Sequence, residues 1–171
     1  MRIKITRTKV YKFGELSAEA HSKVIETLGE INTQCDWWDS VYEDAAQIGI
    51  TITEFDLYHR TIDGNFEDYP ETIAQEIVEN HGEQCETHKT ATLYLKNRAA
   101  LLNKYPDDED GDRGAEGEDA IDDLNIGFKR SILKDYRESL SREYDYLTSR
   151  EAVIELIDSN GYEFTEKGKL A

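Results

Sequence analysis

The chain of 171 residues contains little proline, little cysteine and no long apolar run. With two Pro and eleven Gly, it is neither collagen-like nor a proline-rich disordered chain. No segment approaches the roughly 18 consecutive apolar residues of a membrane span, so we expect no membrane association. The two cysteines, Cys35 and Cys85, form no CxxC pair, and no secretory signal precedes them. They predict free thiols in a reducing cytoplasm.

Basic residues are also scarce, because 20 Lys and Arg stand against 37 Asp and Glu, a net charge of −17. The excess lies in three blocks: residues 14–47 hold eight acids and one base, and residues 54–88 and 107–123 each hold ten acids and one base. Residues 124–171 are nearly balanced, with nine acids and eight bases. Such a charge repels phosphate groups and argues against direct binding of nucleic acid.

The pattern of apolar residues predicts a single α+β domain over residues 1–171: a small antiparallel sheet packed with a long antiparallel helical hairpin and short helices. Alternating β-branched and aromatic residues predict strands at 2–13, 50–58 and 162–164. Helical spacing predicts short helices near 17–31, 38–48 and 149–160, and the two long helices at 70–104 and 118–147. An acidic, flexible loop is expected between the long helices, at about 105–117.

Local signals place the expected ends of these elements. Ser17 and Thr148 are the expected N-caps of the first and last helices, and Asp68 is that of the first long helix. The dipeptide Asp63-Gly64 predicts a hairpin turn. Asn160-Gly161 predicts a left-handed helix end.

Carboxylates recur at helical spacing without intervening bases, which predicts acidic columns facing solvent. Such like-charge pairs cost a few tenths of a kcal/mol each, so a protein needing only solubility could avoid them. A solvated surface without a partner is the simpler interpretation. Trp37 and Trp38 lie among these acids, and an exposed Trp there would be an interface anchor. The candidate partner-binding residues are these two Trp, the first column (Glu76, Glu79, Glu83, Glu86), the second column (Asp36, Asp39, Glu43) and the loop acids (Asp107, Asp108, Glu109, Asp110).

The most enzyme-like cluster is His81, Cys85 and His88, which share one face if the helix is continuous. Imidazole and thiolate at that spacing could bind zinc, although a buried thiol and two half-buried His at a helix interface are the commoner outcome. The sequence contains no GxSxG, GxGxxG, phosphate-loop or HExxH motif. We therefore expect no cofactor and no enzymatic activity.

Four segments resemble a family of small acidic proteins of bacteriophages and prophages, largely uncharacterised and in part labelled antitoxin-like. They are YKFGELSAEAHSKVIE (11–26), WWDSVYEDAAQIGI (37–50), HGEQCETHKTA (81–91) and REYDYLTSREAVIELIDSNGYEFTEKGK (142–169). The resemblance implies a phage setting and carries no catalytic residues. Small acidic proteins of phages often bind and block host proteins.

Together, charge and resemblance predict a non-enzymatic phage protein that binds and inhibits a basic host protein, such as a nucleic-acid-binding defence factor, and that mimics nucleic acid. An antitoxin that neutralises a cognate toxin, and a metal-dependent enzyme that uses His81, Cys85 and His88, are the alternatives. The sequence leaves open whether the long helices pair within one chain or in a homodimer. We expect the protein in the cytoplasm of the host bacterium.

Overall fold

The computed structural model describes residues 9–171, which form six α-helices and one two-stranded antiparallel sheet. This confirms the predicted α+β class. The described residues form two compact units, unit 1 (residues 9–37 and 142–171) and unit 2 (residues 38–141), and the single α+β domain stays a prediction. No helix within residues 9–171 is both long enough and apolar enough to cross a bilayer.

Unit 2 begins with helix α2 (Asp39–Gln47), followed by the hairpin of strands β1 (Ile50–Asp56) and β2 (Thr61–Phe66). The strands pair from Ile50 with Phe66 to Asp56 with Thr61. The predicted turn at Asp63-Gly64 is wrong, because both residues lie inside β2 and the turn occupies residues 57–60.

Close packing explains why glycine stands inside β2. A Cβ atom on Gly64 would lie 2.7 Å from the carbonyl oxygen of Thr51 and 2.9 Å from Cδ2 of Leu133. Glycine in a strand often marks such a close approach rather than a turn. Gly64 therefore allows the hairpin to pack directly against the helix that carries Leu133.

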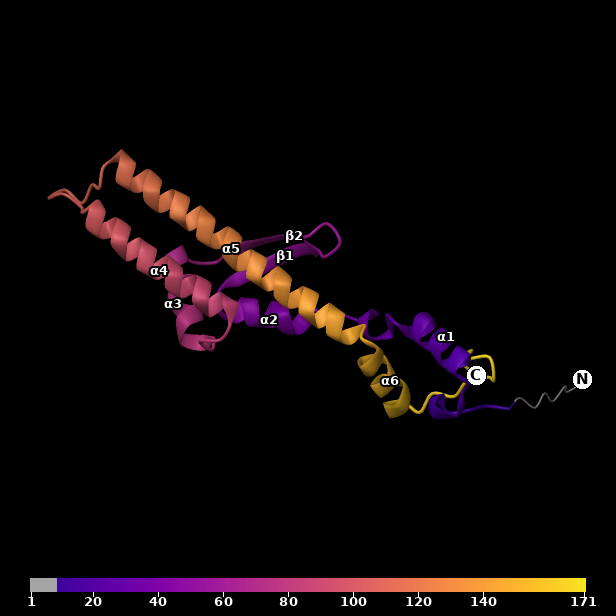
Figure 1. The fold of residues 1–171 in the computed structure, drawn as a ribbon. Helices are drawn as coiled ribbons and strands as arrows, with labels where there is room; N and C mark the ends of the chain where they lie inside the picture. The colour runs from indigo at the N-terminus through magenta and orange to yellow at the C-terminus, as the bar shows by residue number, and fades with distance from the viewer. Residues whose placement is uncertain (1–8) are drawn as a thin grey trace, which may run out of the picture. The chain divides into compact units, whose positions relative to one another are not determined.

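The rest of unit 2 is helical: α3 (Pro70–Asn80), α4 (Glu86–Lys104) and most of α5 (Ala115–Leu147). Figure 1 shows α4 and α5 side by side, with the hairpin along α5. Tyr94 stacks on Phe128 with ring centroids 4.1 Å apart, and the Thr90 hydroxyl donates to Asp135 at 2.7 Å. These contacts confirm an antiparallel helical hairpin within one chain.

The core of unit 2 lies where α2, α3, α4 and α5 meet the hairpin. The largest side chains there that are at most 2 % exposed are Ile48, Ile50, Ile73, Ile77, Ile132 and Tyr136. The first long helix predicted at 70–104 is wrong in one respect, because residues 81–85 form a turn between α3 and α4. Its start is also shifted: Tyr69, not Asp68, is the N-cap, and Pro70 opens the helix.

Unit 1 contains helices α1 (Ala18–Leu28) and α6 (Arg150–Ser159). As predicted, the Ser17 side chain caps α1 by accepting from the amide of Ala20. The expected cap at Thr148 is wrong by one residue, because Ser149 accepts from the amide of Ala152. A hydroxyl at either position can cap the helix, and α6 begins one residue later than the sequence predicted.

The terminal segments of unit 1 meet through isolated bridges instead of continuous strands. Tyr11 pairs with Phe164, and Phe164 pairs with Leu170, in antiparallel arrangement. The predicted strand at 162–164 is therefore reduced to one bridging residue, and the part of the predicted strand at 2–8 lies outside the described residues. The buried core of this unit consists of Phe13, Leu16, Ala20, Val24, Val153, Ile157 and Phe164.

Candidate functional site

The predicted column of four carboxylates is interrupted by the turn at residues 81–85. Glu76 and Glu79 lie on α3, Glu83 lies in the turn, and Glu86 opens α4. The backbone of His81 is extended, with φ −98° and ψ 145°, which ends α3. The prediction of a single helical column is thus wrong. It assumed one continuous helix because the helical spacing continues through this segment of the sequence, but the backbone changes direction at the turn.

The members of this column differ in their contacts. Glu86 pairs with Lys89 at 2.7 Å, and Glu76 accepts from the Asn80 amide at 3.1 Å. Glu79 and Glu83 are exposed, and neither forms an ion pair with a side chain of residues 9–171. Of the column, only these two acids face solvent without a compensating contact in the part of the chain that the structure describes.

The acids of the second predicted column are divided between the units. Asp36 is an exposed residue of unit 1, whereas Asp39 and Glu43 lie one turn apart on the exposed face of α2 in unit 2. Asp39 lies in the first turn of α2, where a carboxylate interacts favourably with the helix dipole. The column therefore includes one acid with a local structural role.

A hydrogen-bonded cluster connects α2 to the turn that carries Glu83. The Tyr136 hydroxyl donates to Asp44 Oδ2 at 3.0 Å, and His81 Nε2 lies 3.6 Å from the same oxygen. His81 Nδ1 lies 2.7 Å from Thr87 Oγ1. Burial, together with the Asp44 carboxylate, raises the pKa of Tyr136, so its hydroxyl keeps its proton and donates. The exposed acids of α2 and of the turn thus belong to neighbouring elements.

The same turn separates the proposed metal ligands. His81 is held by Asp44 and Thr87, Cys85 is exposed at the N-cap of α4, and His88 lies within α4. No group of three His, Cys, Asp or Glu side chains in residues 9–171 is arranged to hold a metal ion. The expectation that His81, Cys85 and His88 share one helical face is wrong, because the helix is not continuous.

The two tryptophans belong to different units and are both half-buried. Trp37 packs on Tyr144 with ring centroids 5.6 Å apart. Trp38 packs on Phe55 at 5.9 Å, and Tyr42 adds an edge contact to the same ring. Each indole therefore has an internal packing role, and neither is the fully exposed interface anchor that the sequence suggested.

The acidic loop ends earlier than predicted, at residue 114, because α5 begins at Ala115. Asp107 pairs with Arg113 at 2.6 Å. Asp108 Oδ1 accepts from the amides of Asp110 and Asp112, both at 2.9 Å. These two carboxylates have partners within the loop, whereas the side chains of Glu109 and Asp110 have neither an ion pair nor a hydrogen bond in the described chain.

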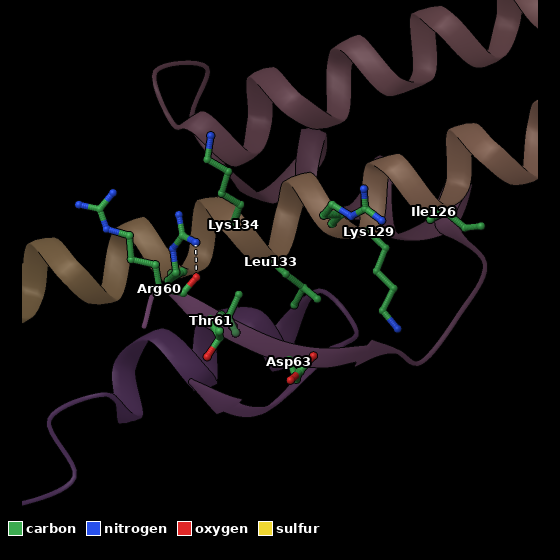
Figure 2. A pocket seen from close by; sticks show the side chains of 10 residues that line it. Arg60, Thr61, Asp63, Ile126, Lys129, Leu133 and Lys134 are labelled. Carbon is green, nitrogen blue, oxygen red and sulfur yellow. Dashed lines mark hydrogen bonds between the residues drawn. The ribbon is translucent and has the colours of Figure 1, made fainter. Parts of the chain in front are cut away.

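A basic groove between β2 and α5 is a feature that the sequence analysis missed. Figure 2 shows Leu133 and Lys129 directed from α5 toward the hairpin. The cavity measures about 650 Å³, a volume typical of ligand pockets. Its charged lining consists of the cations Arg60, Lys129, Arg130, Lys134 and Arg137 and the single acid Asp63.

One half-buried acid outside these surfaces lies in an environment that disfavours its charged form. Burial raises the pKa of Asp135 despite the hydrogen bond from Thr90, and the nearby Glu138 and Glu86 raise it further. Because this pKa is higher in the folded than in the unfolded chain, the contribution of Asp135 to stability falls as the pH rises through the folded-state pKa. At neutral pH the ionised carboxylate therefore destabilises the fold.

Asp135→Asn is expected to stabilise the protein at pH 7 by up to about 1 kcal/mol, since partial exposure screens the effect. Asn keeps an acceptor for Thr90. The gain should disappear below about pH 3.9, the ordinary pKa of Asp, where the native carboxyl is protonated too. Urea denaturation at several pH values measures both. Asp122→Asn, an exposed neutralisation on the same helix, is the control, and a variant less stable than the native chain at pH 7 contradicts the prediction.

Comparison with known proteins adds no family to this description. No protein-family model matches the chain, and no curated protein or solved structure matches it. The resemblance to small acidic phage proteins therefore remains an expectation from the sequence.

Proposed function

We propose that the chain is a non-enzymatic acidic protein that binds a basic surface of another protein. The observation that carries this proposal is the set of exposed carboxylates on α2, α3 and the following turn that lack a cation partner within residues 9–171. They are Asp39, Glu43, Glu79 and Glu83, referred to below as the acidic face.

The neighbourhood of these elements supports the proposal. Because Asp44 contacts both His81 and Tyr136, α2 lies against the turn that follows α3. The acids are mounted on helices and a hydrogen-bonded turn, so holding them in place costs little additional entropy on binding. A rigid acidic surface of this kind steers a basic partner toward it and loses strength as salt is added.

The partner class follows from charge and setting. A net charge of −17 disfavours nucleic acid itself and favours a protein with a basic groove. The phage resemblance makes a nucleic-acid-binding defence protein of the host bacterium the first partner to test, with inhibition by occupation of its basic groove as the mechanism. Pairing of Asp107 and Glu86 with the chain's own cations restricts the proposal to the acidic face.

The test begins with a pull-down from bacterial lysate at low salt, followed by binding measurements on the purified prey. Replacing all four acidic-face residues by Lys is expected to weaken binding at least about tenfold. The native affinity should fall steadily as NaCl is raised, because screening weakens exposed charge interactions.

The matched control reverses charges outside the acidic face. Glu151→Lys with Glu155→Lys changes two exposed acids on α6 and should alter affinity less than about twofold. The double variant Glu79→Lys with Glu83→Lys carries the same charge change within the acidic face. Equal losses in the two double variants, or an affinity that is flat between low and high salt, would reject the proposed surface.

A further inference from the structure

The basic groove contrasts with the rest of the molecule. It lies between β2 and α5, entirely within unit 2, and its wall includes the apolar side chains of Ile62, Leu133 and Ile126. Pockets for small ligands commonly combine an apolar lining with a few polar groups, in volumes of roughly 300–1,000 Å³. At about 650 Å³, the groove falls within this range.

Positive charge exceeds negative charge in the groove. Against five cations stand only Asp63 in the lining and Glu138 beside it, which lies 3.6 Å from Lys134 and 4.0 Å from Arg137. Five cations against these two acids leave a surplus of three positive charges, and Arg60, Lys129 and Arg130 are the cations that Glu138 does not contact. In a chain with a net charge of −17, this concentration of cations needs an explanation.

Structural roles account for only part of the surplus. Arg137 Nη1 donates to the carbonyl oxygen of Arg60 at 2.6 Å and so anchors the hairpin turn to α5. Lys129 donates to Asn65 Oδ1 at 3.3 Å. The side chains of Arg60 and Arg130 are exposed and form no ion pair or hydrogen bond with any part of the described chain, so folding does not require their charge.

The wall of the groove is held in one geometry. Leu133 packs so closely on Gly64 that even a methyl group would not fit between them. The Arg137 contact fixes Arg60, whose backbone has a φ of +56°. A site whose wall is fixed in this way is preorganised and loses little entropy when it binds a ligand.

These observations favour a small anion over a polymer or a second copy of the chain. The net charge repels a long polyanion such as DNA. The chain's own acidic loop is a poor occupant, because Asp107 and Asp108 are already paired within it. The apolar wall favours an organic group beside the charge, and Arg and Lys together suit phosphate oxygens.

We propose that the groove between β2 and α5 binds an organic phosphate of nucleotide size that carries about two to four negative charges. The phosphates contact Arg60, Lys129 and Arg130, and the organic group lies on Ile62 and Leu133. This site is separate from the acidic face and does not depend on the function proposed above.

Isothermal titration calorimetry with ADP as the probe tests the site. We expect ADP to bind with a Kd below about 1 mM, inorganic pyrophosphate to bind more weakly, and adenosine to show no binding. Arg60→Gln with Arg130→Gln should weaken ADP binding at least about tenfold, because both charge-assisted contacts are lost. Circular dichroism of this variant should match the native spectrum, since neither side chain supports the fold.

The control variant is Lys23→Gln with Lys96→Gln, which removes two exposed positive charges elsewhere and should bind ADP as the native chain does. Absence of heat with both ADP and pyrophosphate would overturn the proposal, as would equal weakening in the two double variants. Sedimentation supplies a further criterion. If the native chain forms a dimer and binds no ADP, and Arg60→Gln with Arg130→Gln abolishes that dimer, the groove is an interface with a second copy of the chain. That result would also overturn the proposal.

Discussion

Tyr136→Ala is expected to lower the free energy of unfolding by about 3–5 kcal/mol, the range for truncation of a buried aromatic side chain. Tyr136 lies on α5 in the core of unit 2 and is only 2 % exposed. Its ring fills space beside the hairpin and α2, and its hydroxyl donates to Asp44. Alanine removes the ring and leaves a cavity that rigid helices cannot close. Urea denaturation followed by circular dichroism measures the loss.

Tyr136→Phe separates the ring from its hydroxyl group. It keeps the apolar volume and removes only the hydrogen bond to Asp44, so we expect a loss of about 1 kcal/mol. Asp44 is exposed and can bind water instead, which keeps this loss small. A loss below about 1 kcal/mol for Tyr136→Ala would show that this core does not depend on the ring. Equal losses in the two variants would assign the whole effect to the hydrogen bond.

Elements set by local chemistry could be predicted from the sequence. A serine hydroxyl just before an amphipathic stretch satisfies a free backbone amide, and Ser17 does so for α1. Gly161 ends α6 with a φ of +63°, as Asn160-Gly161 predicted. The long helix predicted at 118–147 begins three residues earlier, at Ala115, because acids in the first turn are favoured there too.

Tertiary packing overrode local preference at two places. The Asp-Gly pair at 63–64 is a common turn sequence, but Leu133 on α5 requires a residue without a Cβ at position 64 of the strand. The predicted helix at 70–104 breaks at His81, whose ring contacts Asp44 and Thr87. Periodicity in the sequence reports which residues are apolar, and it does not reveal a change of direction between two helices of matching phase.

The same distinction between local sequence and tertiary packing applies to the candidate sites. The acidic blocks were visible in the sequence because their residues are adjacent along the chain. The basic groove was not, since Arg60 on the hairpin lies about 70 positions from Lys129 and Arg130 on α5. Residues 124–171 appear balanced in a linear count, although four of their eight cations line the groove. Charge counted along a chain misses surfaces built from distant segments.

Gly168→Ala is expected to destabilise unit 1 by about 2–4 kcal/mol, since two costs combine. Gly168 has a φ of +73°, in the left-handed region that L side chains disfavour. A Cβ atom there would also lie 2.7 Å from the carbonyl oxygen of Ala20 and 3.1 Å from Cγ2 of Val24, a fully buried residue. The backbone of α1 cannot yield without disturbing that core. Urea denaturation of the full chain measures the effect.

Two other glycines of unit 1 separate the costs. Gly161 has a φ of +63°, but its nearest neighbour to a new Cβ is Lys12 Nζ at 3.7 Å, so Gly161→Ala should cost only the backbone strain, about 1–2 kcal/mol. The φ of Gly14 is not left-handed, and no atom of the described chain beyond its two neighbours would lie within 4 Å of an added Cβ, so Gly14→Ala should change stability by less than about 0.5 kcal/mol. The expected order of destabilisation is Gly168, Gly161, Gly14. Equal effects at Gly168 and Gly161 would show that α1 accommodates the added methyl group, and that backbone conformation alone requires glycine after α6.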